Sequence, residues 1–318
     1  CAGDIDQMTL TINPQAIVSA GTDATICEGS TYTLSTATAT DYTSLLWTSS
    51  GTGTFDDATL LAATYTPSAA DIAAGSVILT LTAQSAAPCV EASDAMVLTI
   101  SLQATADAGV DATICEGSAY TLSTASATNA TLVTWSSNGT GSFNNVNLVN
   151  ATYTPSAADI LNGSVILTMT VTSASPCVGD VDQMTLTINP QAIVSAGTDA
   201  TICESSTYTL STATAADYTS LLWTSSGTGT FDDATILAAT YTPSAADIAA
   251  GNVILTLTAQ SAAPCVEASD AMVLTISLQA SADAGIDATI CEGSTYTLST
   301  ASATNAASVT WSSNGTGS

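Results

Sequence analysis

Hydrophobic and polar residues alternate along much of this chain with a period of two residues. Residues 31–35 read Thr-Tyr-Thr-Leu-Ser, and in 96–101 Met, Leu and Ile alternate with Val, Thr and Ser. Successive side chains of a β-strand point to opposite faces, so this alternation is typical of strands that bury one face. The pattern therefore predicts a fold built of short, half-buried strands.

Residues 20–107 contain about seven such segments. The predicted strands lie just before Cys27, at 31–35, around Leu45 and Trp47, near Phe55, and at 63–66, 77–82 and 96–101. A single helical turn is expected at 68–72, ahead of Gly75. Seven strands are the usual count for an immunoglobulin-like β-sandwich, so we predict that fold. Threonine suits the outer faces, because its β-branched side chain favours the extended backbone and presents a hydroxyl to water.

The pattern recurs along the chain with a period of 88 residues. Residues 20–107 and 196–283 differ at only five positions, whereas 108–195 is more divergent. We therefore predict an all-β tandem array of seven-stranded sandwiches. Its parts are the end of a truncated repeat at 1–19, a type A repeat at 20–107, a type B repeat at 108–195, a type A repeat at 196–283, and the start of a truncated type B repeat at 284–318. Both ends cut through a repeat, which indicates an excerpt of a longer chain. No Gly/Ser- or Pro-rich spacer separates the repeats, so neighbours should be closely coupled.

The chain contains no Lys, Arg or His, and its 27 acidic residues give it a net charge of −27. Without His there is no Ser-His-Asp or Cys-His nucleophile, and without Lys or Arg nothing can clamp a phosphate or a nucleic-acid backbone. The negative charge also repels anionic membrane surfaces. We therefore expect no enzyme, no nucleic-acid partner and no membrane insertion in this segment. Disorder is excluded by the 46% content of apolar residues, which are placed periodically.

Carboxylates are the remaining candidate ligands, and calcium is the one cofactor that they could hold. The candidate residues are Asp56, Asp57, Asp232, Asp233, Asp180 and Asp182. Their spacing matches neither an EF-hand loop nor a Gly-rich calcium-binding nonapeptide. The type B repeat carries Asn144 and Asn145 where type A carries the first Asp pair, which weakens that site. The alternative interpretation is that acidity keeps a secreted fibre soluble.

The cysteines recur at fixed spacing and never as Cys-x-x-Cys, which indicates disulfides in an oxidising compartment rather than zinc sites. Two pairings are open. Bridges within repeats would be Cys27–Cys89, Cys115–Cys177 and Cys203–Cys265, whereas bridges across the joints would be Cys27–Cys177 and Cys115–Cys265. A disulfide requires Cα atoms within about 7 Å, and Cys27 and Cys89 are expected at opposite ends of one sandwich. The strand assignment near Cys27 leaves both schemes open.

One tryptophan recurs in each repeat, at Trp47, Trp135 and Trp223. Each follows an apolar residue at a spacing of two in the predicted third strand. By analogy with the buried tryptophan of immunoglobulin-like sandwiches, we expect these side chains to fill the core rather than to form a platform for sugars.

The recurring segments read AGTDATICEGSTYTLS, LLWTSSGTGTF, ATYTPSAADIAAGSVILTLT and PC…DAMVLTI. Together they resemble the PKD-like or immunoglobulin-like tandem repeats of giant bacterial surface proteins, which are typically exported by the type IX secretion system. The resemblance covers the whole chain. It implies a β-sandwich array that forms the stalk of an adhesin or an extracellular filament, with no catalysis in the repeats and a binding head outside them.

These observations favour a structural role: a stalk or shaft segment, secreted to the cell surface, that projects a tip and bears tension. Its expected partners are the preceding and following repeats of the same chain, and further copies if several chains form a homo-oligomeric filament. One alternative is a repeat module that itself binds carbohydrate or another cell surface. The other alternative is a spacer in a secreted enzyme whose catalytic domain lies elsewhere.

Overall fold

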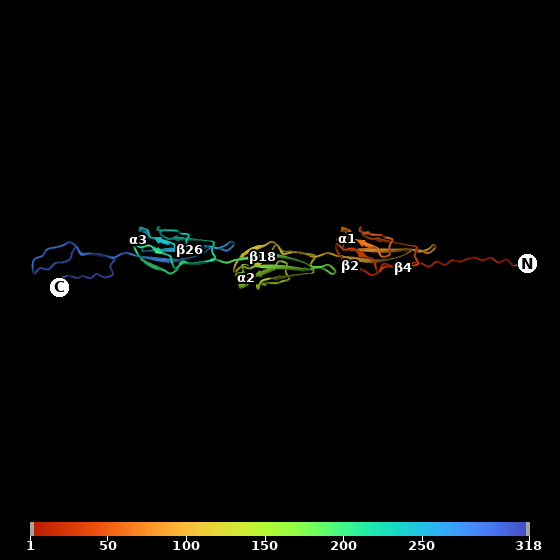
Figure 1. Ribbon diagram of the computed structural model, residues 1–318, viewed down its shortest axis with the longest axis horizontal. Coiled ribbons are helices and arrows are strands. Elements are labelled where there is room, and N and C mark those ends of the chain that lie inside the picture. Colours follow the sequence, from red (N-terminus) through yellow and green to blue (C-terminus); the bar gives the residue numbers. More distant parts are fainter. Residues whose placement is uncertain (1–2, 316–318) are drawn as a thin grey trace. The chain divides into compact units, whose positions relative to one another are not determined.

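The computed structural model describes residues 3–315 and contains three complete β-sandwiches. In Figure 1 the first sandwich is orange, the second yellow to green, and the third green to cyan, and each contains one short helix, labelled α1, α2 or α3. The predicted all-β array of sandwiches is confirmed. Cys1, the first of the periodic cysteines, lies outside the described residues.

The first sandwich has nine strands and one helix. They are β1 (Ile17–Ser19), β2 (Ala24–Cys27), β3 (Tyr32–Thr33), β4 (Thr38–Thr40), β5 (Ser44–Ser49), β6 (Thr54–Phe55), β7 (Thr64–Thr66), α1 (Ala69–Ala74), β8 (Ser76–Gln84) and β9 (Ala92–Ser101). One sheet has the strand order β2-β9-β8-β5 and the other β3-β7-β6, and these two sheets contain the seven expected strands. β1 and β4 form an additional two-stranded pair.

The second and third sandwiches repeat these elements. The second contains β10 (Thr105–Asp107), β11 (Ala112–Cys115), β12 (Tyr120–Thr121), β13 (Ser126–Thr128), β14 (Leu132–Ser137), β15 (Ser142–Phe143), β16 (Thr152–Thr154), α2 (Ala157–Asn162), β17 (Ser164–Thr172) and β18 (Asp180–Asn189). The third contains β19 (Ile193–Ser195), β20 (Ala200–Cys203), β21 (Tyr208–Thr209), β22 (Thr214–Ala216), β23 (Ser220–Ser225), β24 (Thr230–Phe231), β25 (Thr240–Thr242), α3 (Ala245–Ala250), β26 (Asn252–Gln260) and β27 (Ala268–Ser277). β28 (Ser281–Asp283) and β29 (Ser302–Thr304) follow.

Strand pairing places the start of each sandwich slightly earlier than residues 20, 108 and 196. β1 pairs with β4, so it belongs to the sandwich that follows it and not to a repeat that ends at residue 19. β10, β19 and β28 likewise precede those boundaries and pair with β13, β22 and β29. Both members of this pair were missed because neither carries a fully buried large side chain: Val18 and Ala39, which pack against the core, are only partly buried.

The parallel pairing of β2 with β9 determines where Cys27 lies. In this register Ala24 faces Leu98 and Cys27 faces Ser101, the last residue of β9. β9 itself runs antiparallel to β8. Cys27 therefore lies at the end of the sandwich from which the chain leaves, and Cys89, in the loop between β8 and β9, lies at the other end.

The core of each sandwich is built around three aromatic side chains. In the first sandwich Trp47 is 2% exposed and Tyr65 is fully buried. The Phe55 ring lies between them, with ring centroids 6.2 Å from Trp47 and 5.0 Å from Tyr65. The indole N–H of Trp47 donates to the carbonyl of Leu61 at 3.3 Å, so its one polar atom is satisfied. Trp135 and Trp223 are also 2% exposed.

Candidate functional site

Each joint between successive sandwiches is closed by a disulfide. Cys27, at the end of β2, is bonded to Cys177, which lies in the loop between β17 and β18, with Cα atoms 4.9 Å apart. Cys115 and Cys265 form the equivalent bond at the next joint, also with a Cα separation of 4.9 Å. Of the two open pairings, the structure therefore contains the one across the joints. The bridges within repeats are absent from the described residues, where Cys89 and Cys203 form no disulfide.

The connecting segment after β9 is fixed by backbone hydrogen bonds on both sides of the first joint. The Glu28 N–H donates to the Ser101 carbonyl at 2.9 Å, and the Glu28 carboxylate accepts from the Gln103 N–H at 2.8 Å. The Ala104 N–H then donates to the Ser173 hydroxyl of the second sandwich at 2.8 Å. The Cys177 sulfur lies 3.2 Å from the Ser101 carbonyl oxygen. The linker is thus held by the sandwich before it and by the one after it.

The second joint repeats these contacts with the equivalent residues. The Glu116 N–H donates to the Asn189 carbonyl, and the Glu116 carboxylate accepts from the Gln191 N–H, as Glu28 does at the first joint. The Ala192 N–H donates to the Ser261 hydroxyl at 3.0 Å. The amide of Gln191 adds a bond to the Val266 carbonyl at 2.7 Å. The same hydrogen bonds thus form after a type A repeat and after a type B repeat.

Cys89 occupies the same position in its loop as Cys177 and Cys265, but it is unbonded. Its thiol donates to the carbonyl of Asn13 at 3.2 Å, which matches the distance from the Cys177 sulfur to Ser101. Cys203 and Cys291, which are equivalent to Cys27 and Cys115, are exposed and unbonded.

No family model matches this chain, and no curated protein matches it. Among solved structures it is similar to an I-band fragment of titin, with 13% identity, coverage of 84% of this chain and 99% of that one, and a TM-score of 0.49. It is also similar to mouse cadherin-23 EC22–24, with 14% identity, coverage of 83% and 99%, and a TM-score of 0.41. The immunoglobulin domains 1–5 of Sidekick-1 give 14% identity, coverage of 83% and 59%, and a TM-score of 0.38. We therefore base the function on the geometry of the joints.

A buried carboxylate organises the turn before each long central strand. Asp71 is 3% exposed and accepts hydrogen bonds from the N–H groups of Thr52 and Gly53 and from the Tyr65 hydroxyl, at 3.0, 2.9 and 2.8 Å. It also accepts from the N–H of Ser68, whose side chain caps α1 in return. All of its partners are structural, so we assign it no catalytic role. Its copies Asp159 and Asp247 are equally buried, and the capping pattern Ser-x-x-Asp was the sequence signal that could have identified them.

Hydrogen bonds keep these carboxylates ionised. Burial by itself raises the pKa of Asp71, but the backbone N–H groups of Ser68 and Thr52 and the Tyr65 hydroxyl outweigh it and lower that pKa to about 2. Burial is outweighed in the same way by the equivalent donors Ser244, Thr228 and Tyr241, which lower the pKa of Asp247 to about 2, and by their counterparts at Asp159, whose pKa is also lowered. Because the folded pKa lies below the unfolded value near 3.9, this stabilisation is present above about pH 4 and is lost as the pH falls toward 2.

We expect acid to destabilise every sandwich. For Asp71 and Asp247, a depression of nearly two pKa units corresponds to about 2 kcal/mol in each of their sandwiches between neutral pH and pH 2, and Asp159 acts in the same direction. Urea unfolding of the intact chain at pH 7 and at pH 2.5 measures this difference. Equal unfolding midpoints at the two pH values would show that Asp71 and its copies do not stabilise the fold.

The calcium candidates bind backbone groups. The Asp56 carboxylate accepts from the N–H groups of Asp57 and Thr64, and the Asp57 carboxylate accepts from the N–H and hydroxyl of Thr59. Asp232 and Asp233 repeat this arrangement. Asp180 and Asp182 accept from the N–H groups of Ala106 and Ala108, at 2.9 and 2.7 Å. In residues 3–315 no three carboxylate or thiol side chains are gathered as a metal would require.

The oxygens of these carboxylates thus accept hydrogen bonds from strand and turn N–H groups. We expect EDTA or millimolar Ca²⁺ to shift the unfolding temperature of the chain by less than about 1 °C, because a ligand stabilises a fold only when it binds the folded state selectively. Differential scanning calorimetry checks this, and a rise of several degrees with calcium would show that the folded chain binds calcium.

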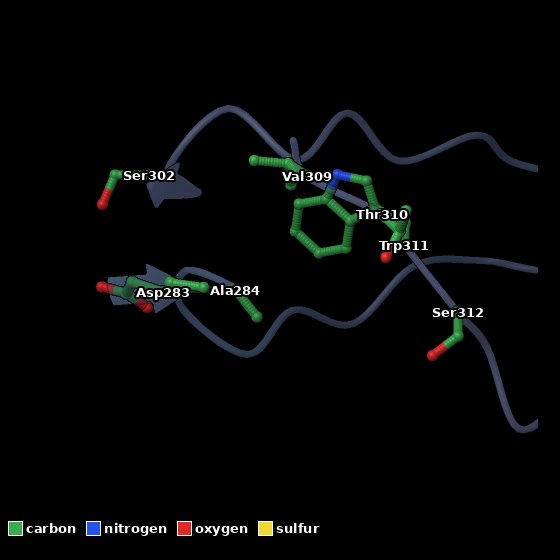
Figure 2. A pocket seen from close by; sticks show the side chains of 8 residues that line it. Asp283, Ala284, Ser302, Val309, Thr310, Trp311 and Ser312 are labelled. Atoms are coloured by element: carbon green, nitrogen blue, oxygen red, sulfur yellow. The ribbon is translucent and has the colours of Figure 1, made fainter. Parts of the chain in front are cut away.

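The hollow in Figure 2 lies in the segment after β27, and Trp311 is the largest side chain that lines it. Trp311 is 56% exposed, unlike its buried equivalents in the three sandwiches. In the second sandwich Phe143 packs against Trp135 and Tyr153 packs against Phe143, and neither has a counterpart in 284–318. We therefore interpret the hollow as the uncovered core of a partial repeat and not as a ligand site.

Among the described residues, no helix is long and apolar enough to cross a membrane, and α1, α2 and α3 have six residues each.

Proposed function

We propose that these repeats form a tension-bearing shaft in a long extracellular protein, of the kind found in bacterial surface adhesins or filaments exported by type IX secretion. The shaft would project a tip domain away from the cell surface. Its repeats would act through their mechanical continuity and would perform no chemistry.

The disulfides across the joints are the observation that carries this proposal. A bridge inside one domain stabilises that domain alone, whereas Cys27–Cys177 and Cys115–Cys265 connect each sandwich covalently to its neighbour. The bridges also require an oxidising compartment, which supports secretion. Hydrogen bonds from Glu28 and Ser173 to the linker remove the flexibility that a spacer between independent modules would need.

The carbohydrate-binding alternative lacks a suitable surface on the complete sandwiches. Sugar sites use exposed aromatic faces, but Trp47, Trp135 and Trp223 are in the core. Tyr42 and Tyr218 are 43% exposed, and each stands alone near a positive-φ turn residue, Asp41 or Asp217. These observations support the shaft over the binding module.

Small-angle X-ray scattering of the oxidised chain tests the proposal at physiological salt. A shaft requires an elongated particle, whereas a compact globule of this length would have a radius of gyration of about 20 Å. We expect a value well above 20 Å for the 31.5 kDa monomer. A value near 20 Å would contradict the shaft. Sedimentation in the same buffer separates a single chain from a multi-chain filament.

A further inference from the structure

The two disulfides enclose overlapping loops. Each bond joins residues that are 150 positions apart, and the loop closed by Cys27–Cys177 shares residues 115–177 with the loop closed by Cys115–Cys265. Bridges inside single repeats would close separate loops instead. The overlap has a mechanical consequence, because the greatest extension of a cross-linked chain equals its shortest covalent path.

We propose that the overlapping bridges make the array a redundant length limiter, which restricts extension under force and still restricts it after one bridge is lost. The inference deepens the proposed shaft function, and it rests on that function only for its biological use. The extension itself follows from which cysteines are bonded.

The shortest covalent path uses both bridges. It runs from residue 1 to Cys27, crosses to Cys177, returns along the chain to Cys115, crosses to Cys265 and continues to residue 318. This path contains about 140 residues of the 318. Segments 28–114 and 178–264, which hold most of the first and third sandwiches, are left out of it. Unfolding these segments therefore adds nothing to the maximum length.

Reduction releases the hidden backbone. About 175 residues become available, and at roughly 3.4 Å per extended residue this is about 600 Å of additional length. Losing one bridge has a much smaller effect, because the remaining bridge still hides 150 residues. Only about 25 residues, or roughly 90 Å, are then released. Losing the first bridge thus changes the maximum length little, and losing the second bridge releases the remaining length of about 500 Å.

Bridges inside the repeats would behave differently. Three separate loops of about 60 residues each would hide a similar total, but their losses would add. Replacing Cys27 and Cys177 together would then break two bridges and release about 125 residues, or roughly 420 Å. The same double replacement releases roughly 90 Å if the bridges overlap.

Single-molecule stretching of the full chain, held at its two ends, tests the inference. The contour length is measured for the oxidised chain, for the reduced chain, for the variant with Cys27→Ser and Cys177→Ser, and for the variant that also carries Cys115→Ser and Cys265→Ser. We expect increases over the oxidised chain of about 600, 90 and 600 Å, respectively. The variant Cys89→Ser is the matched control and should leave the length unchanged, because Cys89 forms no bridge.

An increase near 420 Å for the first double variant, or equal increments for the two pairs, would overturn the inference. Contour length counts covalently available residues whether or not a variant folds, so a misfolded variant still gives a decisive value. The reduced wild-type chain provides the full length without any substitution. If the stretching result contradicts the length limiter, the scattering experiment can still show an elongated particle and support the shaft. If scattering shows a compact particle, the shaft is rejected, but the contour lengths can still be measured.

Discussion

Replacing Asp247 by Ala will lower the free energy of unfolding of the third sandwich by about 4 kcal/mol. The Asp247 carboxylate accepts hydrogen bonds from the N–H groups of Thr228, Gly229 and Ser244 and from the Tyr241 hydroxyl, at 2.9, 2.9, 2.9 and 2.8 Å. Each buried donor that loses its acceptor costs about 1–3 kcal/mol. Water can enter and satisfy part of the site, so the sum is smaller than four full penalties.

Calorimetry of the intact chain measures this effect, because one sandwich should melt about 20 °C before the other two. The melting temperature of this sandwich in Asp247→Asn should lie between those of wild type and Asp247→Ala. The amide oxygen still accepts hydrogen bonds from some of the donors, whereas its NH₂ group is itself a donor and faces another N–H or O–H group. Asp233→Ala is the matched control: Asp233 is an exposed turn residue, and we expect a change below about 1 kcal/mol. A single unsplit transition for Asp247→Ala would contradict this assignment.

Removing the bridge Cys115–Cys265 will destabilise the third sandwich by a similar amount. When that sandwich unfolds beside a folded neighbour, the bridge closes a loop of about 75 residues between the joint and Cys265. The loss of loop-closure entropy in the unfolded chain corresponds to about 4 kcal/mol. We therefore expect the double variant Cys115→Ser and Cys265→Ser to unfold at a lower urea concentration, with little change in the native fold.

The control for this experiment is Cys203→Ser, which removes an exposed and unbonded thiol of the same sandwich. It should leave the urea midpoint within experimental error. If the double variant and the control unfold together, the bridge does not constrain the unfolded chain, and its contribution would be confined to mechanical continuity.

The sequence allowed the strands and the repeat to be predicted because they depend on local alternation. The segments around Trp47, Val77 and Met96 became β5, β8 and β9, and the helical turn at 68–72 became α1. β1 and β4 were missed because Val18 and Ala39, which pack against the core, are only partly buried and neither strand has a large buried side chain such as Tyr65 of β7. Their pairing moved the start of each sandwich ahead of the boundaries expected from the cysteine period.

The joint could be only partly predicted because it depends on pairing between distant strands. Cys27 faces Ser101 only through the parallel register of β2 with β9, and nothing near Cys27 in the sequence specifies that register. The roles of Glu28 and Ser173 depend on the same long-range geometry. In the fold Asp56 and its copy Asp232 accept hydrogen bonds from backbone N–H groups, as do Asp182 and its copies Asp94 and Asp270. Calcium binding by the acidic residues stays a prediction.

Disulfide mapping tests the joint most directly. Trypsin has no cleavage site in this chain, but a protease that cuts after acidic residues releases the same five-residue peptide four times, as 24–28, 112–116, 200–204 and 288–292, with Cys27, Cys115, Cys203 and Cys291. Peptides 72–91, 160–180 and 248–267 carry Cys89, Cys177 and Cys265. The variant with Cys115→Ser, Cys203→Ser and Cys291→Ser leaves 24–28 as the one copy of this peptide that carries a cysteine. After alkylation of free thiols and digestion without reduction, we expect 160–180 to remain bonded to 24–28, with 72–91 and 248–267 alkylated. Recovery of 72–91 bonded to 24–28, with 160–180 alkylated, would show that each bridge stays inside its own repeat and would contradict the covalent joint.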